Sequence, residues 1–278
     1  MAFGNADGFF SPAAREFMTA ILKSPSLDWF QSAAAGIENP ALMMIGQKAR
    51  LYTTNHTQAE SMAEWALWQA LDFLREGPAH RALQSESKWQ RVKAREIRGS
   101  AWLVVGYGSI GQAVGRRVSA LGGEVTGVRR SPGPAEGAVR IASPDKMMAE
   151  LPRADVVLLC PPHTPETENM ANADFFAAMA PQAIFLNLGR GALVDEAALV
   201  AALDAGRPAF AALDVTRTEP LPPDSPLWHH TRIAITPHDS SDTPGTIAGA
   251  DETFLANLTR YLNGEPLSHL VDPAAFTN

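Results

Sequence analysis

Six short apolar runs, spaced along the chain from residue 101 onward, constrain its fold most strongly. They are 101–105, 124–128, 155–160, 183–188, 210–215 and 232–236. Helix-like segments separate several of them, at 110–121, 145–150, 172–179 and 195–205. Buried strands that alternate with helices are typical of a parallel sheet covered on both faces. The pattern therefore predicts an α/β fold whose main part is a doubly wound, Rossmann-type parallel sheet.

The remaining segments predict a second, smaller α/β unit. We expect residues 57–246 to form a dinucleotide-binding domain, and residues 1–56 with 247–278 to form a substrate domain. Residues 58–75 have the spacing of a strongly amphipathic helix with a broad apolar face, and Gly77-Pro78 would end it.

Composition and charge exclude several classes of function. With 46% hydrophobic and 19% charged residues, the 278-residue chain has the composition of an ordinary soluble globular protein. Its net charge of -7 argues against nucleic-acid and anionic-membrane partners. A single cysteine, Cys160, rules out an internal disulfide framework, and without an H-E-x-x-H motif we expect no metal site. The start carries no secretory signal and no apolar run would span a membrane, so a cytoplasmic location is expected.

A glycine-rich loop directly after the first of the six runs is the first candidate site. Gly106, Gly108 and Gly111 form G-x-G-x-x-G at the start of a helix. The first permits a tight turn, the second lets the backbone approach a pyrophosphate, and the third lets helix and strand pack closely. The pyrophosphate would bind amides at the helix N-terminus. The predicted cofactor-binding residues of this loop are Gly106, Gly108, Ser109, Ile110 and Gly111.

Two arginines follow at the position where such a loop usually has an acidic partner. Arg129 lies close to the expected spacing of roughly 20 residues after the loop. A carboxylate there would bind the ribose hydroxyls and repel a 2′-phosphate, whereas a guanidinium pairs with phosphate oxygens. Arg130 and the Ser131 hydroxyl could add donors, although arginines on a loop can also be solvated surface charges. We favour phosphate recognition, and hence NADP (NADPH) over NAD.

Four polar residues lie just past the ends of later predicted strands: Arg190, Asp214, Glu219 and His238. Ligands of an open parallel sheet bind outside the carboxyl ends of its strands, so these side chains can converge on one crevice. Their types suit hydride transfer to a 2-keto acid. A histidine can donate the proton, a carboxylate can orient its imidazole, and an arginine can clamp the substrate.

The runs "NLGRGALVDEAAL" (187–199), "TEPLP" (218–222) and "ITPH" (235–238) are together highly specific. In them the chain resembles the D-isomer-specific 2-hydroxyacid dehydrogenase family, which includes glyoxylate/hydroxypyruvate reductases and phosphoglycerate dehydrogenases. The resemblance implies that Arg190 binds and polarises the substrate. It implies that Glu219 pairs with His238, the acid/base, and that Asp214 contacts the nicotinamide. The other nearby histidines, His229 and His230, are expected in an exposed turn.

Two further loops match the family. "SAAAGIE" (32–38) resembles the segment whose backbone amides grip the substrate carboxylate, which points to Ala35 and Gly36. "PPHTPET" (161–167) resembles a loop near the cofactor, which points to Pro162 and Thr167 and places His163 where an apolar residue is usual. The family usually forms homodimers through the cofactor domain, so a homodimer is expected.

The expected function is reduction of a small 2-keto acid, such as glyoxylate or hydroxypyruvate, to the D-2-hydroxy acid, with NADPH preferred. One alternative is a non-catalytic dinucleotide-binding sensor. Another is an inactive, shortened family member, because the chain begins partway into the substrate domain that the resemblance implies. Asp239 also departs from the family, which usually has a small or apolar residue after the histidine.

Overall fold

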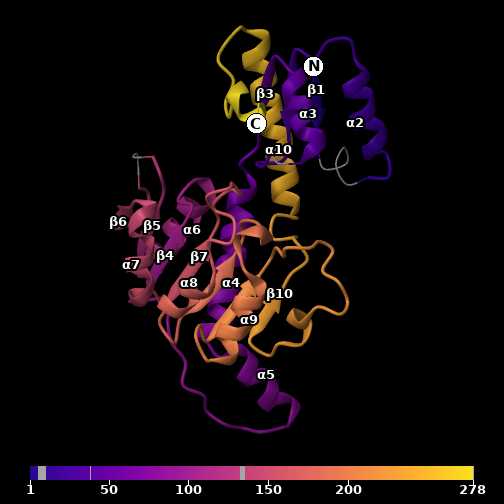
Figure 1. The fold of residues 1–278 in the computed structure, drawn as a ribbon. Helices are drawn as coiled ribbons and strands as arrows, with labels where there is room; N and C mark the ends of the chain where they lie inside the picture. The colour runs from indigo at the N-terminus through magenta and orange to yellow at the C-terminus, as the bar shows by residue number, and fades with distance from the viewer. Residues whose placement is uncertain (6–10, 38, 132–134, 278) are drawn as a thin grey trace. The chain divides into compact units, whose positions relative to one another are not determined.

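The computed structural model describes residues 1–5, 11–37, 39–131 and 135–277 (Figure 1). The chain divides into two compact units. Unit 1 comprises Met1–Gln58 and Asp242–Asn278, and unit 2 comprises Ala59–Ser241.

Unit 2 is built on a seven-stranded sheet in the order β10-β9-β8-β7-β4-β5-β6. Every pair of neighbours is parallel. The strands are β4 (Ala101–Val105), β5 (Glu124–Val128), β6 (Arg140–Ala142), β7 (Val156–Leu159), β8 (Ile184–Asn187), β9 (Phe210–Leu213) and β10 (Ile233–Ile235). The chain moves outward from β4 to β6 and then returns to β7 on the other side of β4, which makes a topological switch point. The predicted doubly wound α/β fold is confirmed, with β6 as an additional strand.

The helices of this part of the chain are α4 (Gln58–Leu74), α5 (Gly77–Ser85), α6 (Ser109–Ala120), α7 (Met147–Glu150), α8 (Ala173–Ala178) and α9 (Glu196–Asp204). The expectation that Gly77-Pro78 ends the preceding helix is wrong. That helix ends at Leu74, Glu76 takes a left-handed φ of 58°, and Gly77-Pro78 forms the first turn of α5. Proline is tolerated there because the first amides of a helix have no partner within the helix.

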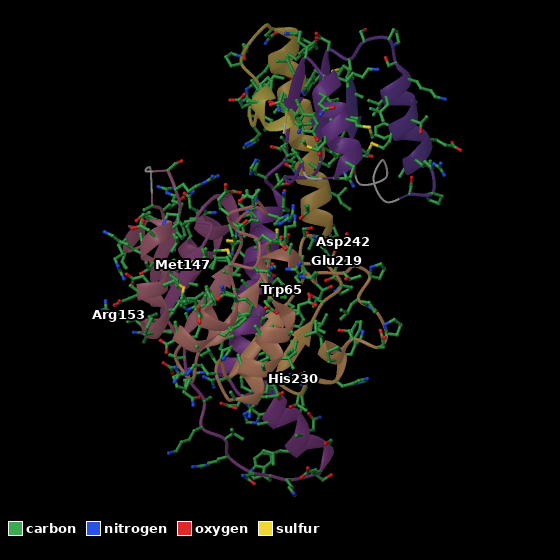
Figure 2. All side chains as sticks on the ribbon, in the orientation of Figure 1. Trp65, Met147, Arg153, Glu219, His230 and Asp242 are labelled. Atoms are coloured by element: carbon green, nitrogen blue, oxygen red, sulfur yellow. The ribbon has the colours of Figure 1, made fainter. Side chains whose placement is uncertain are left out.

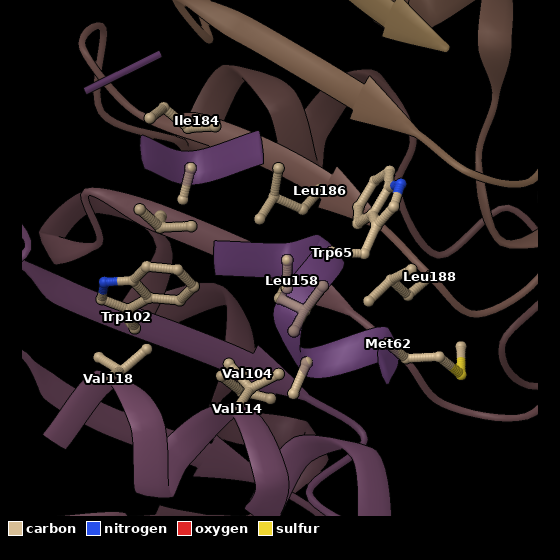
Figure 3. Packing of buried hydrophobic residues seen from close by; sticks show 14 of the residues in the cluster. Met62, Trp65, Trp102, Val104, Val114, Val118, Leu158, Ile184, Leu186 and Leu188 are labelled. Carbon is tan, nitrogen blue, oxygen red and sulfur yellow. The ribbon is translucent and has the colours of Figure 1, made fainter. Parts of the chain in front are cut away.

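Both faces of the sheet are buried. Trp102 and Val104 of β4 pack in one apolar cluster with α4 and α6, as Figure 3 shows. Leu103 and Val105 point to the opposite face and join a second cluster with α8 and α9. Successive side chains of a strand point to opposite faces, so a strand covered on both sides is a continuous apolar run. This is why the six runs were visible in the sequence.

Unit 1 contains a three-stranded parallel sheet in the order β1-β2-β3. Its elements are β1 (Ala2–Gly4), α2 (Ala14–Lys23), β2 (Trp29–Ser32), α3 (Pro40–Lys48), β3 (Leu51–Thr53), α10 (Pro244–Leu262) and the 3-10 helix η5 (Pro273–Phe276). Phe30, Ile45, Tyr52 and Phe276 form the centre of its apolar core. No helix within the described residues is both long enough and apolar enough to cross a membrane.

A buried polar network accompanies that small core. The Gln31 Oε1 atom accepts hydrogen bonds from the Thr53 hydroxyl at 2.7 Å and from the Asn257 side-chain amide at 2.9 Å. The Gln31 Nε2 atom donates to the carbonyls of Ser32 and Thr54, each at 3.0 Å. The network joins β2 and β3 to α10, more than half the chain length away in sequence.

Candidate active site

All the candidate residues of unit 2 follow the carboxyl end of a strand. The glycine loop follows β4, Arg129 follows β5, and the loop with Pro162 and Thr167 follows β7. Arg190 comes after β8, Asp214 and Glu219 after β9, and His238 after β10. Because the seven strands are parallel, these loops lie along one edge of the sheet.

The glycine loop has the geometry of a dinucleotide cradle. Gly106 has φ 92°, and a Cβ on it would lie 2.4 Å from the Pro161 nitrogen, in the loop after β7. A Cβ on Gly111 would lie 2.8 Å from the Gly106 carbonyl oxygen. At Gly108, by contrast, no atom of the described residues outside its immediate chain neighbours comes within 4 Å of a Cβ position. α6 begins at Ser109, so its first amides adjoin this open space, and a pyrophosphate fits there.

The two arginines after β5 differ in exposure. Arg129 is half-buried, and its backbone amide donates to the Ala142 carbonyl of β6 at 3.2 Å. Arg130 and Ser131 are exposed. Of the three, Arg129 therefore has the environment least like that of a freely solvated surface charge, and it is the best candidate to bind a phosphate.

His238 and Glu219 form a hydrogen-bonded pair. The His238 Nδ1 atom lies 2.8 Å from Glu219 Oε2, and the second carboxylate oxygen accepts from the Thr216 amide at 3.1 Å. An ionised carboxylate can only accept, so it selects the tautomer with the proton on Nδ1. The His238 side chain is 47% exposed, which leaves its Nε2 atom available for proton exchange with a ligand.

Asp214 fixes the backbone turn that carries this histidine. Its side chain is buried and accepts from the Thr236 hydroxyl at 2.6 Å, from the Ser240 hydroxyl, and from the amides of Asp239 and Ser240 at 3.2 Å. The Asp214 carbonyl accepts from the His238 amide at 2.8 Å, where His238 has a left-handed φ of 57°. The nicotinamide contact predicted for Asp214 stays a prediction. The role of Asp214 in anchoring the His238 turn was not apparent from the sequence.

The Arg190 turn is shaped by Asn187 and by tight packing. Asn187 Oδ1 accepts from the Gly189 amide at 3.1 Å, and Asn187 Nδ2 donates to the Arg190 carbonyl at 3.0 Å. A Cβ on Gly191 would lie 2.0 Å from the Thr216 carbonyl carbon, so the backbones touch here. The structure thus brings the loop of Arg190 against the loop that contains Glu219.

Sequence reasoning missed Arg217, which ties three loops together. Its guanidinium donates to Glu168 at 3.0 Å and to Asn169, both after β7, and to the Ala192 carbonyl at 3.3 Å, after β8. Its backbone amide donates to Glu196 at 2.6 Å. The Arg217 hydrogen bond, with a smaller contribution from His163, lowers the pKa of Glu168. An exposed arginine in a loop carries no local signal of such a role.

The Thr167 side chain closes the loop after β7 through hydrogen bonds within that loop. The Thr167 hydroxyl accepts from the Thr164 amide at 2.7 Å and donates to the Pro162 carbonyl at 2.9 Å. The cofactor contacts predicted for Pro162 and Thr167 stay predictions. His163, which stands where the family usually has an apolar residue, places its Nε2 atom 2.5 Å from Glu168 Oε2 and so joins the Arg217 network.

The other candidates lie elsewhere. Ala35 and Gly36 are half-buried in unit 1, in the loop after β2. His230 pairs with Asp204 at 3.4 Å, and Figure 2 shows it well separated from Glu219 within unit 2. Within the described ranges, no group of three or more His, Cys, Asp or Glu side chains is arranged to hold a metal ion.

Known proteins resemble this arrangement in sequence and in structure. A family model described as "D-isomer specific 2-hydroxyacid dehydrogenase, NAD binding domain" matches residues 67–240. A glyoxylate/hydroxypyruvate reductase A of Serratia proteamaculans is 33% identical over 214 residues, covering 77% of this chain and 68% of the relative.

Solved structures of proteins from the same family also match this chain. An NADPH-dependent glyoxylate/hydroxypyruvate reductase of Sinorhizobium meliloti, in complex with NADP and sulfate, matches with a TM-score of 0.82 and 28% identity, over 93% of this chain and 83% of that one. A D-isomer-specific 2-hydroxyacid dehydrogenase of Xanthobacter autotrophicus, in complex with NADPH and MES, matches with a TM-score of 0.80 and 32% identity, over 91% and 80%.

Proposed function

The chain belongs to the D-isomer-specific 2-hydroxyacid dehydrogenase family, and from that premise we propose that it reduces small 2-keto acids to D-2-hydroxy acids with NADPH. It is an NAD(P)-dependent oxidoreductase, as the members of this family are. The observation that carries the proposal is the His238–Glu219 pair, 2.8 Å apart, on the same sheet edge as the glycine loop.

His238 supplies the proton in this proposal. When bound at the glycine loop, the nicotinamide cofactor supplies the hydride. Protonated His238 would donate from Nε2 to the keto oxygen of the substrate, on which negative charge develops during reduction. Glu219 keeps the ring oriented through Nδ1 and stabilises its positive charge before transfer. In the oxidative direction the same nitrogen accepts the hydroxyl proton.

Arg190 binds the substrate in this proposal. The planar guanidinium of Arg190 pairs with the carboxylate and polarises the keto oxygen. The backbone amides of Ala35 and Gly36 remain the predicted contacts of a substrate carboxylate. We propose glyoxylate or hydroxypyruvate as the substrate class, supported by the activity for which the Serratia and Sinorhizobium proteins are named.

The test follows the oxidation of NADPH by the purified protein with glyoxylate and with hydroxypyruvate. We expect turnover in the wild type, and a loss of kcat of about 10²- to 10⁴-fold in His238→Gln with NADPH binding retained. His230→Gln is the matched control, because His230 lies away from the site, and its kcat should stay within twofold. A folded wild type that binds NADPH yet oxidises it with neither keto acid would instead support the non-catalytic, dinucleotide-binding alternative.

The preference for NADPH over NADH is a separate part of the proposal. It is supported by the half-buried Arg129 after β5, and by structural neighbours determined with NADP and NADPH. Hydrogen bonds to charged groups contribute about 1.5–3 kcal/mol, so Arg129→Ala should raise the KM for NADPH roughly 10- to 100-fold. The KM for NADH should change little. Equal efficiency with both cofactors, unaltered in Arg129→Ala, would remove this part and leave the reductase activity intact.

We also propose that the protein is a homodimer associated through unit 2. Trp68 of α4 is 57% exposed, and Trp89, after α5, is fully exposed. Tryptophans are enriched in the buried centres of protein interfaces. Light scattering on a sizing column should give twice the chain mass, and Trp68→Glu with Trp89→Glu should give a monomer. Trp228→Glu is the control, because Trp228 is also exposed but lies far in sequence from Trp68 and Trp89.

A further inference from the structure

Tyr107, between the first two glycines of the loop, occupies a slot made by other glycines. Its side chain is fully buried. A Cβ on Gly115 of α6 would lie 1.9 Å from the Tyr107 hydroxyl oxygen, and a Cβ on Gly127 of β5 would lie 2.4 Å from Tyr107 Cγ. The ring therefore fits between α6 and β5 only because both positions lack a side chain.

The polar groups of Tyr107 hydrogen-bond to two residues that flank the segment 129–135 in sequence, Val128 and Glu136. Its backbone amide donates to the carbonyl of Val128, directly before Arg129, at 3.0 Å. Its hydroxyl donates to the carbonyl of Glu136 at 2.6 Å. Burial raises the pKa of Tyr107 to about 12, against the opposing influence of the nearby Arg116 and Arg129 guanidiniums, so the hydroxyl remains a donor at neutral pH.

Glu136 and Gly137 also contact α6 directly. Gly137 has φ 75°, and a Cβ on it would lie 2.3 Å from the Arg116 nitrogen and from the Gly115 carbonyl carbon. The Arg116 guanidinium pairs with the Glu136 carboxylate at 3.1 Å. The backbone at 136–137 is therefore pressed against the helix that begins at the glycine loop.

We propose that Tyr107 is a positioning residue for cofactor specificity. Its backbone amide and ring hold the end of β5 at Val128 and Gly127, and its hydroxyl holds Glu136. Tyr107 thereby sets where Arg129, the residue after Val128, is presented, and so sets the preference for a 2′-phosphorylated adenosine. Tyr107 itself does not touch the phosphate. The inference rests on the proposed NADPH preference and adds a residue through which Arg129 acts.

Tyr107→Phe isolates the hydroxyl, because the ring and its packing remain. One neutral hydrogen bond affects an equilibrium by a few-fold to about tenfold, so affinity for a 2′-phosphorylated ligand should fall about 3- to 10-fold. Affinity for a ligand without that phosphate should stay within twofold. Tyr261→Phe is the matched control, since it removes a hydroxyl that bonds to Asp28 within unit 1.

The experiment measures binding of adenosine 2′,5′-bisphosphate and of 5′-AMP by calorimetry, and so needs no turnover. In an Arg129→Ala background, Tyr107→Phe should have no further effect on the ratio of the two affinities. Gly137→Ala, which keeps the tyrosine but crowds the backbone next to the Glu136 carbonyl, should lower the ratio in the same direction as Tyr107→Phe.

The outcomes separate this inference from the proposed function. A wild type that prefers the bisphosphate, together with Tyr107→Phe protein of unchanged ratio, would overturn the inference alone. Equal weakening of both ligands in Tyr107→Phe would also overturn it, since the residue would then serve only packing. A wild type without preference would overturn both the cofactor preference and this inference, whereas NADPH oxidation with a keto acid would still test the reductase activity.

Discussion

Units 1 and 2 are both parallel sheets with helices, yet different interactions dominate their interiors. In unit 2 the strands bury apolar side chains on both faces, and the polar candidates lie beyond the strand ends. In unit 1 the fully buried polar side chains include Gln31, Thr53 and Asn257, which lie on β2, β3 and α10. Thr53 and Asn257 each donate a hydrogen bond to the side chain of Gln31.

The difference reflects how much apolar area each unit can bury. A small three-stranded sheet buries less of its chain, so apolar burial alone specifies its arrangement less strongly. A satisfied buried network adds direction, because each donor must find its acceptor. It also makes unit 1 sensitive to the loss of one polar group, whereas unit 2 should be most sensitive to a cavity.

The largest expected effect comes from a cavity in unit 2. Phe185 of β8 is fully buried and packs edge-on against Phe175 and Phe176 of α8. Phe185→Ala should lower the free energy of unfolding by about 3–5 kcal/mol in urea denaturation. Leu121→Ala, at an exposed site of the same unit, should change it by less than about 0.5 kcal/mol. Similar losses in the two variants would contradict an apolar basis for the stability of unit 2.

An intermediate effect is expected from breaking the network of unit 1. Gln31→Leu keeps much of the volume but leaves buried donors and acceptors without partners, at a cost of about 1–3 kcal/mol. Hydrogen exchange should rise in residues 51–54 and 257–268 and stay unchanged in unit 2. The control is Gln47→Leu, which removes one bond, to the Phe276 carbonyl, from an exposed side chain. Unchanged exchange in Gln31→Leu would show that the network is dispensable.

The smallest expected effect is a pH dependence confined to unit 1. The rings of His56 and His269 lie 4.5 Å apart, and burial lowers the pKa of both below 6.5. Each histidine is therefore protonated more readily in the unfolded chain. Stability contributed by the neutral pair is present above pH 6.5 and is lost as the pH falls towards the folded-state values.

Hydrogen exchange of unit 1 between pH 8 and pH 5, corrected for the intrinsic rate, measures this loss. His56→Gln should flatten the profile, whereas His229→Gln in unit 2 should not. A wild-type profile that is already flat would show that protonation of the pair does not affect unit 1.

Much of the fold and part of the site were predictable because the signals are local. The six apolar runs predicted six strands, since burial on both faces makes a strand almost continuously apolar. β6 was missed because it has only three residues and begins with Arg140. The spacing of the glycines and the positions of Arg190, Glu219 and His238 after their strands were also readable. Their predicted roles remain to be tested by the variants above.

The sequence by itself determined the α/β class, the dinucleotide loop and the residue types of the candidate site, because each is encoded over a few consecutive residues. Only the tertiary structure decided which partners those residues have. Asp214 anchors the His238 turn, Arg217 joins three loops, and Tyr107 fills a slot between Gly115 and Gly127. Such partners come from separate parts of the chain and meet only when the sheet brings its strand ends to one edge, so no local pattern records them.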